Sequence, residues 1–263
     1  MLRYIVAFLF LNLSYGQNSA LFSVEYLYQN DYYTNKQFLY GNSMNSVYVT
    51  TPLNQKNEEV KYTVNGSEYT LSPNEIKLDQ SLYFKSNIEN TVYGVQSLDF
   101  KNRFVVIDST IIFNWVLVND TRLIAGVICK GATVNFRGRD YLAFYNENIP
   151  INAGPYKFSG LPGLIMSLES EAGTEFHRWT VVSFKSDLDS VPFKYDLLNE
   201  MKFTKVSLYD YVKLCDSQAA ELFKALRSRS DDTDATLTNS VTVRSGIERT
   251  YEWENEPDDK TKK

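Results

Sequence analysis

Short runs of alternating apolar and polar residues, each of strand length, recur along most of this chain. Such runs stand at 21–28, 46–50 and 178–185, and they are rich in the aromatic and β-branched residues that favour strands. The strongest run, 103–118, holds two apolar stretches around a polar break at 108–110. We therefore predict a mainly β (α+β) fold, built on a twisted antiparallel sheet or a half-barrel.

One segment late in the chain has a different period. Apolar residues between 208 and 226 recur at spacings of three and four, which is typical of one face of an amphipathic helix. Ser207 before the run and Asp210 three residues later resemble a capping box. The pattern predicts one C-terminal helix over 207–227, packed on the sheet, with Cys215 on its apolar face.

The first residues have the pattern of a secretory signal. Arg3 precedes an apolar run from Tyr4 to Leu13, and small residues follow at Ser14 and Gly16. A membrane-spanning helix needs roughly 20 apolar residues, which is more than this run supplies. We expect a signal peptide over residues 1–16, export to the periplasm or the outer membrane, and no transmembrane segment after its removal.

The rest of the chain is expected to form one domain and a tail. Residues 17–227 are predicted to be a single domain, and residues 228–263 a polar, mobile tail, because their composition buries too little apolar surface to offset the entropy of ordering. The formal net charge of the chain is -5. This argues against a nucleic-acid partner, which favours a basic face.

The two cysteines allow two interpretations. Export would permit a disulfide between Cys129 and Cys215. Alternatively, both are buried free thiols that pack as small apolar side chains. The sequence leaves both open.

The glycine- and proline-rich segment before Met166 predicts a rigid connection. Its central residues are Gly160, Leu161, Pro162, Gly163, Leu164 and Ile165. Pro162 fixes its own φ and biases Leu161 towards an extended backbone, and the two glycines permit a positive φ or the close approach of another strand. Leu161, Leu164 and Ile165 would then fill an apolar pocket. Such a loop either locks two strands together or contacts a ligand or partner.

The residues around this segment resemble the GLPGLI family, exported proteins of Bacteroidota. The resemblance covers about 112–168. It includes Trp115, Thr121–Gly126, Cys129, Lys130, Ala132, Phe136–Arg139, Ala143–Tyr145, Ile149, Pro150 and Gly154–Ile165. Phe144 and Tyr156 stand where the family has tryptophan. The resemblance implies no established activity, and it suggests an envelope partner such as a TonB-dependent outer-membrane transporter.

Arg137 and Arg139 flank Gly138 and are expected to face the same side of a strand. As a pair they would hold a carboxylate or phosphate group of a ligand, or else pair with the chain's own acidic residues. The candidate binding residues are Arg137, Arg139, Tyr145, Tyr156, Leu161 and Pro162.

Residues suited to catalysis are sparse. The chain has one histidine, His177, and neither a nucleophile elbow, a phosphate loop nor the paired spacing of zinc ligands is found. Lys130 beside Cys129 would depress the thiol pKa. The leading hypothesis is a non-catalytic exported protein that binds a ligand or partner, without cofactor or metal. The alternative is a hydrolase that uses Cys129, or a serine, with His177.

Overall fold

A computed structural model describes residues 20–50, 60–64, 67–71, 81–98, 102–172, 175–190, 203–227, 244 and 246–254. The predicted mainly β fold is confirmed. The strands are β1 Leu21–Asn30, β2 Thr34–Gly41, β3 Asn45–Val49, β4 Val60–Val64, β5 Ser67–Leu71, β6 Leu82–Ser86, β7 Thr91–Ser97, β8 Arg103–Asp108, β9 Val116–Ile124, β10 Val127–Phe136, β11 Arg139–Asn146, β12 Leu164–Ala172, β13 Glu175–Leu188 and β14 Thr204–Ser207. The helices are α3 Leu208–Arg227 and the short 3-10 helix η1 Glu252–Glu254. The signal-peptide prediction concerns residues outside the described ranges.

Twelve of the strands form one open sheet, in the order β14-β8-β7-β6-β3-β2-β1-β13-β12-β11-β10-β9. Neighbouring strands are antiparallel except β14, which pairs parallel with β8. The sheet is therefore mixed, and the expectation of a purely antiparallel sheet is wrong at this edge. Strands β9–β13 lie between β8 and β14 along the chain, and a parallel pair requires a long crossover of this kind. Strands β4 and β5 form a separate hairpin.

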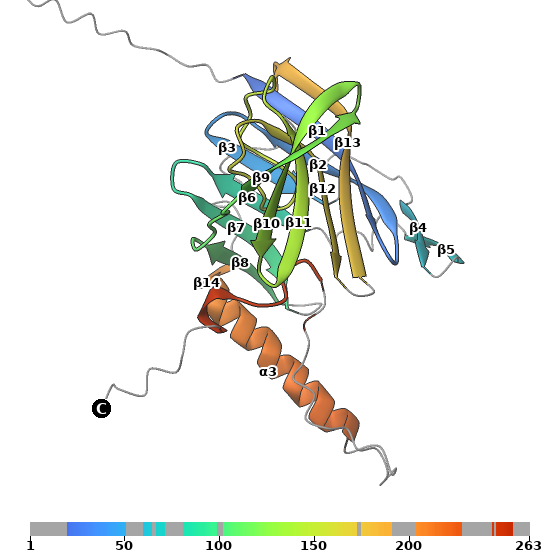
Figure 1. The fold of residues 1–263 in the computed structure, drawn as a ribbon. Coiled ribbons are helices and arrows are strands. Elements are labelled where there is room, and N and C mark those ends of the chain that lie inside the picture. Colours follow the sequence, from blue (N-terminus) through green and yellow to red (C-terminus); the bar gives the residue numbers. More distant parts are fainter. Residues whose placement is uncertain are drawn as a thin grey trace, which may run out of the picture.

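The sheet coils until its two halves share one core. Strands β9–β11 cross in front of β1–β3 in Figure 1. Along β1, every second side chain from Phe22 to Tyr28 is buried, as a half-buried strand requires. These side chains belong to the same apolar cluster as Phe144, Leu168 and Trp179 from the other half of the sheet. The coiling creates the concave interior in which the later features lie.

The segment between β8 and β9 is less regular than its apolar pattern predicts. Residues 109–115 are not a strand, although Ile111 is buried. Phe113 and Trp115 stack at 5.9 Å between ring centroids, and both lie beside Phe158. The aromatic side chains of this segment therefore pack on the loop before β12, and this tertiary contact overrides the local preference for a strand.

The glycine- and proline-rich connection between β11 and β12 is ordered and lies in the concave interior. Leu161, Leu164 and Ile165 are buried, as predicted. The amide of Ile165 donates to the carbonyl oxygen of Ala153 at 3.0 Å, and the Trp115 indole donates to that of Ser159 at 2.8 Å. The connection thus fills the space between the two halves of the sheet.

The predicted helix is present and begins as expected. The Ser207 hydroxyl accepts a hydrogen bond from the Asp210 amide at 3.1 Å, which caps the first turn. Leu208, Tyr211 and Val212 are buried against Val106 of β8, whereas Leu222 is 60% exposed. The helix projects away from the sheet in Figure 1. Contact through the first turns is present, but packing of the whole apolar face on the sheet is not.

Part of the predicted tail belongs to the fold. Residues 246–254 lie against the β10–β11 turn, where the amides of Arg249 and Thr250 donate to the Arg137 carbonyl oxygen at 2.8 and 3.2 Å. Tyr251 is buried. Composition alone does not predict this packing of 246–254, because it rests on ion pairs that the composition does not reveal. Mobility of the tail stays a prediction. The domain boundary at residue 227 stays a prediction.

The cysteines are free thiols, so the disulfide interpretation is wrong. Cys129 is buried in the main core and Cys215 is half-buried on α3. They belong to separate apolar clusters, Cys215 lying against the one formed by Val106 and Tyr211. The interpretation as two packed thiols is the one that the structure supports.

Gly163 supplies a sharp test of the clamped connection. A Cβ atom at this position would lie 2.1 Å from the Asn146 carbonyl oxygen, so Gly163→Ala must shift the backbone. We expect it to lower the free energy of unfolding by about 3 kcal/mol. Gly126→Ala is the control, because Gly126 also has a positive φ but no atom lies within 4 Å of its added Cβ; its cost should be about 1 kcal/mol. Equal losses in urea unfolding would contradict the clamp.

Candidate functional site

A buried cluster of charged side chains lies where four distant segments meet. Asp108, at the end of β8, accepts two hydrogen bonds from the Arg137 guanidinium at 2.7 and 2.9 Å. Lys157 donates to Asp108 at 2.9 Å and to Glu248 at 2.8 Å. Arg137 also donates to Glu248 and to Glu252, each at 3.0 Å. The segments 108, 137, 157 and 248–252 are thereby joined.

Burial and charge compete in this cluster, and charge prevails. The side chains of Arg137, Lys157 and Asp108 are at most 2% exposed. Burial alone raises the pKa of a carboxyl group, but Lys157 and Arg137 outweigh it and hold the pKa of Asp108 at about 2. Burial lowers the pKa of Lys157, but the carboxylates of Glu248 and Asp108 outweigh burial and hold this pKa above its ordinary value. All three groups are therefore charged at neutral pH.

The predicted pair of guanidinium groups is engaged by carboxylates of the protein itself. Arg137 occupies the β10–β11 turn with a φ of 46°, whereas Arg139 is in β11 and fully buried. Arg139 binds the Glu175 carboxylate and donates to the Gly246 carbonyl oxygen at 2.6 Å. These contacts favour the interpretation of the two arginines as structural pairs.

The other predicted binding residues are not all brought together. Tyr145 and Leu161 are buried, and Pro162 is exposed. Tyr156 is half-buried and packs edge-on against Tyr83, with ring centroids 4.7 Å apart. Of these residues, Tyr156 lines cavities that the structure describes.

Tyr83 and Tyr156 form a wall between two hollows. The larger, of about 460 Å³, lies among α3, the sheet and the residues Arg244, Ile247, Glu248 and Tyr251, and is here named the tyrosine cavity. The smaller, of about 160 Å³, is lined by tyrosines and Trp179 in the concave interior. In the smaller chamber, Trp179 donates to the Gln37 side chain at 2.8 Å. The aromatic lining and the hydroxyl groups suit a small ligand that is part apolar and part polar.

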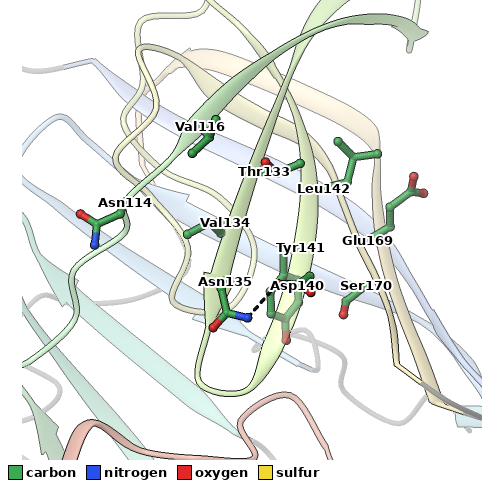
Figure 2. Close-up of a pocket in the computed structure, with 10 residues that line it drawn as sticks. All are labelled: Asn114, Val116, Thr133, Val134, Asn135, Asp140, Tyr141, Leu142, Glu169 and Ser170. Atoms are coloured by element: carbon green, nitrogen blue, oxygen red, sulfur yellow. Dashed lines mark hydrogen bonds between the residues drawn. The ribbon is translucent and has the colours of Figure 1, made fainter.

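A third hollow, here named the trough, lies on the exposed face of strands β9–β12. Its volume is about 800 Å³. Figure 2 shows its lining residues Asn114, Val116, Thr133, Val134, Asn135, Asp140, Tyr141, Leu142, Glu169 and Ser170. Val116, Thr133, Leu142 and Glu169 are register partners across the four strands, so they form one row across the sheet.

Polar groups stand at the ends of the trough. Asn135 donates to Asp140 at 2.7 Å, drawn as a dashed line in Figure 2. Glu169 pairs with Arg122 at 2.9 Å and with Arg178 at 3.2 Å. These pairs flank a floor that includes Thr133 and Leu142. The trough therefore offers apolar contact at its centre and hydrogen-bonding groups at its ends.

The residues of the hydrolase hypothesis are not arranged as a nucleophile and base. Cys129 is buried, its thiol contacts the Val127 carbonyl oxygen at 3.6 Å, and burial raises its pKa, which disfavours the reactive thiolate. No hydrogen bond joins it to His177 within the described ranges. Ser170 is the register partner of His177 across β12 and β13, but its hydroxyl has no hydrogen-bond partner among the described residues.

The hydrogen bonds around His177 do not link it to Ser170. Asn30 donates to the Tyr28 hydroxyl oxygen at 3.2 Å, and that hydroxyl lies 2.7 Å from His177 Nδ1. The Tyr28 oxygen has two lone pairs, so it can accept from Asn30 and also from a protonated Nδ1, and both ring tautomers are compatible with these contacts. His177 Nε2 has no hydrogen-bond partner among the described residues, so no hydrogen bond joins it to Ser170.

The residues that sequence reasoning missed are Asp108, Lys157 and Glu248. Asp108 belongs to the polar break at 108–110, Lys157 to the segment that resembles the GLPGLI family, and Glu248 to the predicted tail. Nothing in their spacing links them, because the cluster forms only when the sheet coils. Among the described residues, no group of three or more His, Cys, Asp or Glu side chains could hold a metal ion. None of the described helices is both long and apolar enough to cross a membrane.

Comparison with known proteins supports the fold and the family type in general terms. A family model described as a protein of unknown function (Porph_ging) matches residues 137–167, which include Arg137, Lys157 and the connection before β12. No curated protein matches the sequence.

Two solved structures of PNGF-II, in C2 and P21 crystal forms, are similar in fold, with TM-scores of 0.52 and 0.51. Each is 14% identical, and the match covers 75% of this chain and 33% of the PNGF-II chain. The chain thus corresponds to about a third of PNGF-II, and at this identity the likeness concerns the fold alone.

Because the chain has a single histidine, a change in stability between pH 6.5 and 4 can be assigned to His177. Burial, with Arg139 and Arg249 nearby, lowers the pKa of His177 from 6.5 to about 4. Between pH 6.5 and 4, His177 therefore binds a proton in the unfolded chain but not in the folded chain. The free energy of unfolding falls as the pH falls through this window. We expect a loss of about 3 kcal/mol in the free energy of unfolding. In His177→Asn, which keeps an acceptor for Tyr28, this part of the loss should disappear. An unchanged pH slope in that variant would contradict the assignment.

Proposed function

We propose that this chain is an exported, non-catalytic envelope protein of the GLPGLI type. It binds an extended polypeptide segment of a partner, such as an outer-membrane transporter, along strand β9. The observation that carries the proposal is that β9 ends the sheet order and carries exposed apolar side chains beside the trough. The signal-like pattern of residues 1–16 supports the location.

The outer edge of β9 is suited to strand addition. No described strand pairs with it, and Val116, Leu117 and Leu123 are 63%, 65% and 70% exposed. Strand β9 contains neither lysine nor proline, two residues that commonly block the pairing of an edge strand with another chain. Its two charged residues have partners within the protein: Arg122 pairs with Glu169, and Asp120 accepts from the Thr121 amide. A register shift opposite Lys130 and Gly131 divides the strand into two regular stretches. An added strand would obtain main-chain hydrogen bonds from this edge.

The trough supplies side-chain selectivity next to that edge. Its row of partly exposed side chains starts on β9 with Val116 and ends at Glu169 on β12. Side chains of an added strand alternate between the two faces of the sheet, so every second one would lie towards the trough. Apolar side chains would contact Val116 on the neighbouring strand, and polar ones would reach Asn114 or Asn135.

A crosslinking experiment tests the binding surface. We expect a photo-crosslinking amino acid in place of Leu117 to capture a defined envelope protein in intact cells. The control position is Ile88, which is 74% exposed in the turn between β6 and β7 and belongs to neither β9 nor the trough. Adding Leu123→Lys should remove the Leu117 adduct, because the charge disfavours burial under a partner strand. The same adducts from positions 117 and 88 would contradict the proposal.

Export is tested separately. The protein recovered from the periplasmic or outer-membrane fraction should begin at Gln17, because the signal pattern predicts cleavage after Gly16. An apolar run weakened by Phe8→Asp should leave the chain uncleaved in the cytoplasm. Recovery of the wild-type chain in the cytoplasm with Met1 intact would contradict this part of the proposal.

A further inference from the structure

The tyrosine cavity combines aromatic rings with a surplus of acidic groups. Its wall includes Tyr83, Tyr156, Tyr211 and Tyr251. The ionisable lining residues are two carboxylates, Asp216 and Glu248, against one guanidinium, Arg244; the thiol of Cys215 also lines the cavity. An aromatic wall with more carboxylates than bases is the type of surface that attracts an organic cation.

The ion pairs around the cavity show the same imbalance. The ion pairs at the cavity include three basic side chains, Arg137, Lys157 and Arg244. They hold five carboxylates, Asp108, Asp216, Glu248, Glu252 and Glu254. The neighbouring group of Arg139, Arg249 and Glu175 is one positive charge in excess and lines no part of the cavity. With that group included, the carboxylates still outnumber the basic side chains by one.

The tyrosine rings of this wall already pair with cations of the protein. The Lys157 ammonium lies 5.2 Å from the Tyr156 ring centroid and 5.9 Å from that of Tyr83. The Arg244 guanidinium lies 5.2 Å from the Tyr251 centroid. Distances within about 6 Å are those of cation–π contacts. The Tyr211 ring, on the α3 side of the cavity, has no such cation among the described residues.

Two polar groups of the lining remain available. Arg137 and Lys157 both donate to Oε1 of Glu248, and Oε2 receives no hydrogen bond from a described residue. The Gln96 side-chain amide, from β7, makes no hydrogen bond within the described ranges either. The carboxylate oxygen and the amide oxygen are both acceptors. They match a ligand that brings donors and a positive charge.

We propose that the tyrosine cavity binds an alkylammonium group, from a free amine or from the lysine side chain of a peptide. The ammonium donates to Glu248 Oε2 and to the Gln96 amide oxygen, and it lies against the Tyr211 ring. Its aliphatic part packs on Leu208 and Val212, which also line the cavity. An anion would meet the surplus carboxylates, and a neutral alcohol would bring no positive charge to offset them.

Binding to the chain can be followed by NMR through the backbone amide signals of Leu208 and Val212, which line the cavity and are present in every variant. The free-amine probe is n-butylamine, and 1-butanol and butyrate are the matched neutral and anionic probes. The peptide probes are acetyl-Gly-Lys-Gly-amide and its Gln counterpart. We expect n-butylamine, the Lys peptide or both to bind at least about tenfold more tightly than their uncharged counterparts. Which of the two binds identifies the source of the ammonium.

Substitutions at Gln96 test the site without disturbing the buried ion cluster. Gln96→Lys places a competing ammonium in the cavity and should abolish binding of the amine probe. Gln96→Met keeps the size without the charge and should weaken binding only a few-fold, because one hydrogen bond is lost. Glu169→Gln in the trough is the control for net charge and should have no effect. Equal binding of n-butylamine and 1-butanol, no binding of either ammonium probe, or undiminished binding to Gln96→Lys would overturn the proposal.

Discussion

The Asp108 carboxylate, held between Arg137 and Lys157, is the interaction on which the rest of the structure depends. Three charges that are almost completely buried would be unfavourable singly, and they are stable here because each has hydrogen-bonded partners of opposite sign. The cluster joins the end of β8, the β10–β11 turn, the connection before β12 and the segment that contains Glu248. Removal of one partner would leave the others buried and unpaired, so these four segments are ordered together.

This constraint explains why the concave interior is shaped as it is. The segment that carries Glu248 lies over the β10–β11 turn, and its residues Ile247 and Tyr251 line the tyrosine cavity. Lys157 follows Tyr156, whose ring separates that cavity from the inner chamber. The residues that fix the coil of the sheet therefore adjoin those that line its hollows. By contrast, the trough and the edge of β9 lie on the exposed face, and a partner strand there would leave the ion cluster undisturbed.

Much of the local structure was predictable from the sequence. The alternating pattern of β1, the capped start of α3 and the burial of Leu161, Leu164 and Ile165 all follow from short-range rules. These features depend on period, capping and the fixed φ of Pro162, which are properties of neighbouring residues. The resemblance around 112–168 also pointed to the ordered connection that fills the interior. The failures lie elsewhere: at 109–115, at the parallel pairing of β14, and in the packing of 246–254, which composition does not predict.

Those failures share one physical reason. Whether Phe113 and Trp115 form a strand or pack on Phe158 depends on a loop more than 40 residues away. Whether Glu248 is part of a polar tail or a buried ion pair depends on Arg137 and Lys157, about 100 residues earlier. The sequence by itself determined strands with a clear alternation such as β1, the capped helix, and where the chain is stiff. Only the tertiary structure decided which charges are buried together, because their pairing energy exists only after the sheet has coiled and excluded water.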